Sequence, residues 1–135
     1  MRLLTHNSMR NNTKDANGKG YPLKITAVEV KVVDHPDAMA VGDRELDFVR
    51  RLLPTLEWSA LVQAASDLGI NTLPPILTEE LAQDPAFLGA LYHILMNVHL
   101  EAGMLTCPVT GREFPVNDGV PNMMLEEEEC ERVKI

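Results

Sequence analysis

The sequence predicts an α+β fold: a small β lobe built from both ends of the chain, with a helical lobe inserted between them. Apolar residues alternate with the period of strands near both ends and follow helical spacing through the middle. The last third also contains a turn like the knuckle of a zinc ribbon, without its full set of cysteines. We therefore expect a degenerate zinc-ribbon-like lobe from residues 1–34 plus 103–126, an inserted helical lobe over 35–102, and an acidic tail over 127–135.

Composition narrows the functional class. With 135 residues, 45% of them hydrophobic, the chain can form one compact domain or two small lobes that share a core. The formal net charge of -8 repels phosphate backbones, so we expect any contact with RNA to come through a more basic partner. The two cysteines are too few for a disulfide scaffold, and the first residues lack the apolar run of a signal peptide. We expect a soluble protein that is either cytosolic or nuclear.

The N-terminal third predicts one strand. Met1–Thr5 is a short apolar start, and Asn7–Gly20 is polar without periodicity, so we expect a mobile surface loop there. Tyr21–Val33 has the alternation of a strand, and Asp34–Gly42 ends it. The apolar positions change parity within this strand, which predicts a bulge or a bend near Ala27. They are Leu23, Ile25 and Ala27, followed by Val28, Val30 and Val32.

Helical stripes fill the middle of the chain. Asp43 is a plausible N-cap for the first helix, Thr55 for the second, and Gly69 is a natural end for the second. The apolar stripe of the first helix comprises Leu46, Val49, Leu52 and Leu53, and that of the second comprises Trp58, Leu61, Val62, Ala65 and Leu68.

Two further helices follow a connector over Asn71–Ile76. Thr78 precedes a short acidic helix, and Asp84 precedes a proline at the first helical position of the next one. That last helix is the longest, and its apolar spacing predicts that it continues to near Gly103.

Met104–Leu125 predicts three short strands joined by two turns. In the first turn, Thr110 stands where a zinc knuckle would carry its second cysteine. Pro121 cannot donate a backbone hydrogen bond, so it belongs at an edge strand or a bend. Its neighbours are more apolar than an exposed edge normally tolerates. Packing on the chain's own core and docking to a partner are equally good explanations, and both can hold on opposite faces of one strand.

The sequence offers little for metal binding or catalysis. Cys107, Cys130, His6 and His35 are the only set that folding could assemble, and no two of them share a knuckle. We therefore expect Cys107 to be a small buried hydrophobe and Cys130 an exposed thiol. His93 and His99 are six residues apart on the long helix and do not share a face, so a packing role is favoured.

The near neighbours of Cys107, Thr106 and Pro108, offer no base that could activate its thiol, and no phosphate-binding loop is present. Glu126–Glu129 is best explained as a solvated tail. These observations favour a binding protein over an enzyme. The alternative is a metal-binding or redox protein built on a degenerate zinc ribbon.

Several stretches, in this order along the chain, resemble one known family. The stretches are Met1–Asn7 (MRLLTHN), Tyr21–Leu23 (YPL), Glu57–Ala60 (EWSA), Glu101–Pro108 (EAGMLTCP), Gly111–Pro115 (GREFP) and Gly119–Leu125 (GVPNMML). The family is the eukaryotic methyltransferase activator subunit, the tRNA-methyltransferase one-twelve homologues. The last stretch is the most specific.

The resemblance implies a non-catalytic subunit that forms heterodimers with class I S-adenosylmethionine-dependent methyltransferases. Those partners modify tRNA, ribosomal RNA and the glutamine of the class I release factor, and they bind the S-adenosylmethionine themselves. We expect no contact with a membrane. The implied contact is strand addition plus an apolar patch, made by Thr5, Asn7, Val120, Pro121, Asn122, Met123, Met124 and Leu125.

This chain differs from the zinc-bearing members of that family in its cysteines. Some members hold zinc with four cysteines, two near the start and two in the knuckle. Here no cysteine precedes Cys107, and Thr110 replaces the last ligand, so we expect no metal and no cofactor. Packing around Leu4, Leu105, Phe114 and Val116 would then hold the β lobe together.

Overall fold

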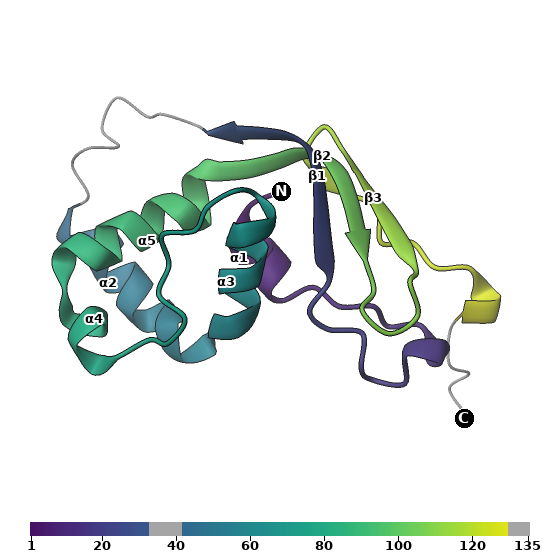
Figure 1. Cartoon of the computed structure of the whole chain (residues 1–135), viewed down its shortest axis with the longest axis horizontal. Helices are drawn as coiled ribbons and strands as arrows, with labels where there is room; N and C mark the ends of the chain where they lie inside the picture. The colour runs from purple at the N-terminus through teal and green to yellow at the C-terminus, as the bar shows by residue number, and fades with distance from the viewer. Residues whose placement is uncertain (33–41, 130–135) are drawn as a thin grey trace.

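A four-stranded antiparallel sheet joins the two ends of the chain (Figure 1). The computed structural model describes residues 1–32 and 42–129. The strands, in sheet order, are β1 (Lys24–Val32), β2 (Val98–Thr106), β3 (Glu113–Asn117) and β4 (Val120–Pro121). The pairing of β1 with β2 confirms that strands flanking the helical middle belong to one sheet, and thereby confirms the α+β class.

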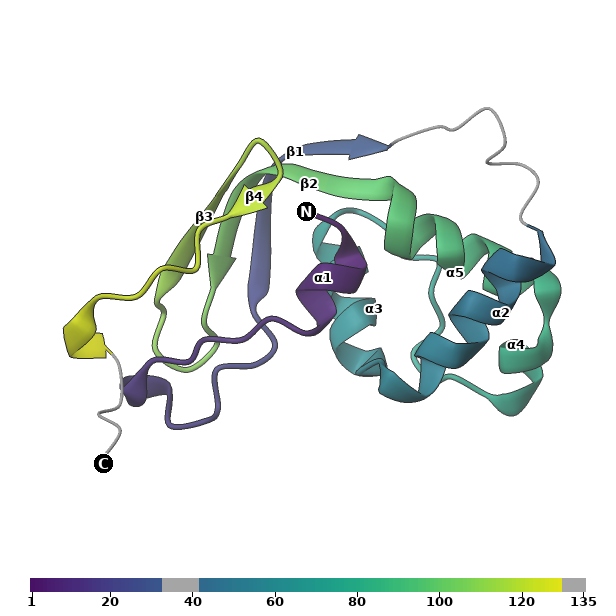
Figure 2. The ribbon, with the colours of Figure 1, turned by 180° about the vertical axis from the view of Figure 1, so that it is seen from behind.

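The helices lie together at the end of the molecule opposite β3 and β4, as both ribbon views show (Figures 1 and 2). They are α1 (Leu3–Asn7), α2 (Asp43–Leu52), α3 (Trp58–Asp67), α4 (Glu79–Gln83) and α5 (Pro85–Asn97). Short 3-10 turns are η1 (Lys14–Ala16), η2 (Leu53–Thr55) and η3 (Glu127–Glu129). In the described ranges, no helix has both the length and the apolar character needed to cross a bilayer.

Local capping explains several helix ends. The Thr78 hydroxyl accepts from the Leu81 N–H at 3.3 Å, and the Asp84 carboxylate accepts from the Ala86 N–H at 3.0 Å, which confirms both predicted caps. Gly69, with a φ of +86°, ends α3 as predicted. The caps predicted for the first two helices were wrong.

At the first of these, Asp43 is already helical, and Gly42 holds the cap position without a side-chain hydrogen bond. At the second, Thr55 donates its hydroxyl to the Leu52 carbonyl at 2.7 Å, so it closes η2. α3 begins only at Trp58, after Glu57.

The junction of α5 with β2 overturns another prediction. α5 ends at Asn97 and β2 begins at the next residue, whereas the apolar spacing predicted a helix to near Gly103. Val98 and Leu100 are buried on either side of a half-buried residue, the alternation of a strand. Their backbone pairs with β1 on one side and with Met1 and Arg2 on the other. This pairing comes from distant parts of the chain, so helical spacing alone could not reveal it.

The predicted irregularity in β1 is confirmed. The register with β2 shifts between Ala27 and Glu29, and again between Glu29 and Val30. Opposite Ala27, β2 carries Gly103, where an added Cβ would lie only 2.5 Å from the Thr26 carbonyl oxygen. β1 therefore bends at this point, and its second half turns away from the first (Figures 1 and 2).

The core joins buried side chains of the helices to those of β1, β2 and β3. Of the four residues expected to hold the β lobe together, Leu105, Phe114 and Val116 are fully buried and Leu4 packs on the edge of the core. Other fully buried members include Leu3, Leu61, Leu88, Leu91, Leu95 and Leu100. Burial of each such side chain stabilises the fold by about 1.5–3 kcal/mol.

The expectation of a mobile surface loop over Asn7–Gly20 was wrong. The apolar start contributes the buried residues Met1 and Leu3, and the polar stretch after helix α1 packs into the molecule. Asn11, Thr13 and Ala16 are buried there, and the Asn11 N–H donates to the Gly20 carbonyl at 2.8 Å. Backbone and side-chain hydrogen bonds, not apolar periodicity, fix this stretch.

His6 links α1 to the start of β1. It is 1% exposed, and its Nε2 lies 2.8 Å from the Leu23 carbonyl oxygen. A carbonyl only accepts, so Nε2 carries the proton, while Nδ1 is buried with no partner in the described chain. Burial lowers the pKa of His6, although the Leu23 hydrogen bond and nearby Asp67 oppose that effect.

The neutral state of His6 predicts acid sensitivity. Below about pH 6.5, the ordinary histidine pKa, the unfolded chain binds a proton that buried His6 resists. The free energy of unfolding should therefore fall as pH falls, as measured by urea unfolding at about pH 7.5 and 5.5. A His6→Gln variant should lose this His6 contribution, while a His93→Gln variant keeps it. Equal acid sensitivity in parent and His6→Gln would contradict the assignment.

Candidate partner-binding surface

The segment Val120–Leu125 runs along the edge of the sheet. Asp118 and Gly119, both with positive φ, form a tight turn that brings β4 back against β3. Asn117 pairs with Val120, and the Asn122 N–H donates to the Pro115 carbonyl at 2.8 Å. β4 is the last strand of the sheet in the described residues, so Pro121 sits on an edge, as predicted.

Side chains of this segment divide between the core and the solvent. Met123 and Leu125 are partly buried and pack against the core, whereas Val120 is 66% exposed and Met124 82% exposed. Pro121 is half-buried and Asn122 is exposed. The chain itself covers one set of apolar side chains and leaves a second set on the surface.

Arg112 fastens this segment to the turn before β3. Its Nη2 donates to the Met124 carbonyl at 3.4 Å, and its Nε lies 3.2 and 3.3 Å from the two carboxylate oxygens of Glu129. The guanidinium carbon lies 4.8 Å from the centroid of the Phe114 ring. Glu129 therefore is not part of a solvated tail, and that expectation was wrong for this residue.

The two N-terminal candidates lie on α1. Thr5 is exposed, but Asn7 is only 6% exposed. The Asn7 side chain donates to the Glu57 carbonyl and accepts from the Glu57 N–H, both at 3.0 Å. This two-way contact ties α1 to the start of α3. The structure therefore uses the Asn7 amide inside the chain, and contact of Thr5 or Asn7 with a partner stays a prediction.

The turn between β2 and β3, from Cys107 to Arg112, is held by hydrogen bonds. Asn11 donates its amide to the Thr110 hydroxyl at 3.2 Å, and the Thr110 N–H lies 3.4 Å from the Cys107 sulfur. The Cys107 N–H donates to the Arg112 carbonyl at 2.8 Å. Cys107 is 3% exposed, as expected for a small buried hydrophobe. Its burial would raise the thiol pKa, but hydrogen bonds from Asn11 and Thr110 outweigh burial and lower the pKa to about 7.

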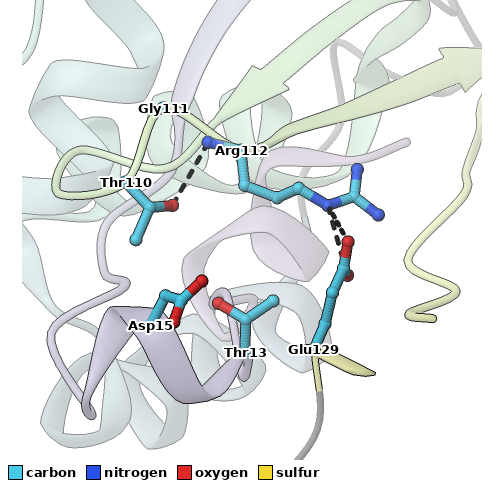
Figure 3. A pocket seen from close by; sticks show the side chains of 6 residues that line it. All are labelled: Thr13, Asp15, Thr110, Gly111, Arg112 and Glu129. Atoms are coloured by element: carbon cyan, nitrogen blue, oxygen red, sulfur yellow. Dashed lines mark hydrogen bonds and ion pairs between the residues drawn. The ribbon is translucent and has the colours of Figure 1, made fainter. Parts of the chain in front are cut away.

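A pocket of about 250 Å³ opens beside this turn (Figure 3). Thr13 and Asp15 lie on one side of it, and the Arg112–Glu129 ion pair lies on the other. Thr110 and Gly111 complete its lining. The pocket offers hydroxyl groups and charged groups but no assembled set of metal ligands. Across residues 1–32 and 42–129, no three His, Cys, Asp or Glu side chains converge on one point.

The other candidate ligands lie apart from the turn. His6 contacts Leu23, His93 lies 3.0 Å from the Asn97 amide, and His99 donates to the Met96 carbonyl at 3.0 Å. His93 and His99 are half-buried and hydrogen-bonded, which agrees with a packing role. His35 and Cys130 fall outside the described residues.

Comparison with known proteins places the chain in a family. No family model matches it. It is 42% identical over 134 residues to multifunctional methyltransferase subunit TRM112 homolog A of Arabidopsis thaliana, covering 96% of this chain and 99% of that protein. It is 39% identical over 131 residues to the TRM112-like protein of Mus musculus, covering 97% and 99%. The chain belongs to the TRM112 family of multifunctional methyltransferase subunits. The resemblance read from the sequence is thereby confirmed.

The roles of Arg112, Glu129 and Asn11 are not evident from the sequence alone. Arg112 and Glu129 are 17 residues apart, and Asn11 and Thr110 are 99 residues apart. No local periodicity connects such positions. The only signal was indirect: Thr110 at a ligand position implied that something other than metal must hold the turn.

The Cys107 contacts predict a thiol that titrates unusually low. In a Cys130→Ser variant, the thiolate absorbance should rise with a midpoint near pH 7. Removing the Asn11 amide with Asn11→Ala should move the midpoint toward the ordinary value of about 9, while the exposed neighbour Asn12→Ala leaves it unchanged. Because the native pKa is depressed, the free energy of unfolding should rise between about pH 7 and 9. A midpoint near 9 in the parent would refute this assignment.

Proposed function

We propose that this chain is a non-catalytic subunit that activates and stabilises S-adenosylmethionine-dependent methyltransferases. The relatives' names support a methyltransferase subunit. We further propose that the partners are class I enzymes acting on tRNA, ribosomal RNA and the translation release factor, bound as heterodimers in the cytoplasm and nucleus. RNA would reach the complex through the partner, because the net charge of -8 disfavours direct binding.

The observation that carries this proposal is the exposure of apolar side chains on a fixed sheet edge. Val120 and Met124 are exposed although Arg112 and the neighbouring strand hold their backbone in place. A surface fixed before binding loses little conformational entropy on association. Methionine is suited to such a contact because its flexible thioether adapts to the opposing surface.

The edge also has backbone groups available for strand addition. The Asn122 N–H points toward β3, so strand alternation turns the Pro121 carbonyl outward. A partner strand could donate to that carbonyl while its side chains cover Val120 and Met124. Stable interfaces of this type bury about 1,600 Å² in total. A partner bound only in its folded state is stabilised by mass action.

The same proposal covers the architecture around this edge. We propose that residues 1–34 and 103–126 form a zinc-ribbon-like lobe that has replaced its metal with packing and hydrogen bonds, that residues 35–102 form an inserted lobe, and that residues 127–135 form an acidic tail. The Asn11–Thr110 hydrogen bond and the buried Phe114 support this division. The chain needs no cofactor in this proposal, and the partner binds S-adenosylmethionine.

Substitution of Met124 tests the surface. Met124→Asp should weaken binding to a co-expressed methyltransferase by at least roughly 30-fold, because a charge in an apolar interface costs about 2 kcal/mol or more. The melting temperature should not change, since the side chain is 82% exposed. Met123→Asp should also lower the melting temperature, because Met123 packs on the core.

The matched control is Ile76→Asp, at an apolar residue that is 71% exposed away from the sheet edge. It should bind the methyltransferase as the parent does in co-purification and titration. Full binding by a folded Met124→Asp variant would overturn the proposed surface. Failure of the parent to bind any methyltransferase of its own source would overturn the proposed function.

A further inference from the structure

The second half of β1 is an exposed apolar strand on the opposite edge of the sheet. Val28 is 80% exposed, Val30 38% and Val32 51%. In the described part of the chain, β1 has β2 as its only strand neighbour, so its other edge is unpaired. Soluble proteins usually protect such an edge, because it can pair with another chain.

The sequence of this edge is complementary to itself. Val28-Glu29-Val30-Lys31-Val32 reads, in reverse, as valines at the same positions with glutamate and lysine exchanged. Two copies aligned antiparallel about Val30 would place Glu29 opposite Lys31 of the other copy, twice. They would also place Val28 opposite Val32, twice, and Val30 opposite itself. Opposite charges and β-branched residues are favourable cross-strand pairs.

Neither Glu29 nor Lys31 forms an ion pair within the described residues. Glu29 and Lys31 are both exposed, and the ion pairs recorded for residues 1–32 and 42–129 involve other side chains. Val30 and Val32 lie on the apolar face of the sheet. Val30 pairs with Leu100 and Val32 pairs with Val98, and both β2 residues are buried on that face. A second copy would extend this apolar face.

We propose that this edge is a self-association surface, at which β1 of one copy pairs antiparallel with β1 of a second copy about Val30. The interface is isologous, so it closes with two copies. The bulge turns this half of β1 away from β3 and β4 (Figures 1 and 2). The segment Val120–Leu125 lies at the other edge of the sheet and stays uncovered. This proposal therefore does not depend on the proposed function.

The contact should be weak. A pairing of five residues on each side falls below the area of standard stable interfaces, which is about 1,200–2,000 Å². Two copies of net charge -8 also repel each other. We therefore expect dimers to appear as concentration rises toward the millimolar range, with a monomer predominating in dilute solution.

Charge exchange gives a direct test by sedimentation velocity of the full chain up to about 1 mM. Glu29→Lys alone, or Lys31→Glu alone, converts both attractive pairs into repulsive ones and should weaken dimerisation roughly tenfold. The double variant Glu29→Lys/Lys31→Glu restores both pairs and should dimerise within about twofold of the parent. Lys24→Glu has the same charge change as Lys31→Glu, but lies outside the palindrome, and should match the parent.

A parent that stays monomeric throughout this range would overturn the proposal. So would single variants that dimerise like the parent, or a double variant no better than the singles. Circular dichroism of each variant checks that the fold is intact, so that a lost dimer reports on the interface.

Disulfide trapping tests the register. In a Cys130→Ser background, Val30→Cys places the new thiol opposite its own copy, within disulfide reach. Val28→Cys places the two thiols four residues apart along the strands, about 13 Å, which is too far. Mild oxidation should therefore crosslink Val30→Cys and not Val28→Cys. Equal crosslinking of both variants would refute the register about Val30.

Discussion

The antiparallel pairing of β1 with β2 is the constraint on which the rest of the structure depends. It closes the helical segment between two strands and brings both ends of the chain to one sheet. β2 is paired on its other side as well. Leu100 exchanges two backbone hydrogen bonds of 2.8 Å with Met1. The second half of β2, from Gly103 to Thr106, pairs with β3. The buried side chains of Leu100 and Leu105 fix this central strand in the core. The positions of β1 and β3 are set by their pairing with it.

A short series of contacts connects that centre to the proposed methyltransferase-binding edge. β3 adds to β2, β4 adds to β3, and Arg112 then ties the Met124 carbonyl and Glu129 back to the turn. The turn itself is held by hydrogen bonds among Asn11, Thr110 and Cys107. Hydrogen bonds can maintain such geometry provided their groups are buried and satisfied. These contacts fix the position of the edge relative to the central strand β2.

The predictions that were confirmed depend on residues that are close together in the sequence. They include the caps at Thr78 and Asp84, the stop at Gly69 and the bulge after Ala27. The failures share a different cause. The strand at Val98–Gly103, the burial of Asn11 and the Arg112–Glu129 pair are all fixed by partners that are distant in the chain. For the site, the sequence indicated the apolar residues of Val120–Leu125, but it could not show which of them the core already covers. It also could not show that the Asn7 amide is used internally.

The central claim is that a methyltransferase covers the sheet edge at Val120–Leu125. Hydrogen–deuterium exchange of this chain, free and in complex with a co-expressed methyltransferase, tests it most directly, because exchange reports protection residue by residue. The account predicts slower exchange at the amides of Val120 and Met123–Leu125 in the complex, with little change in α2, α4 and the second half of β1. Protection confined to the helices, or to β1, with an unchanged edge at Val120–Leu125 would contradict it.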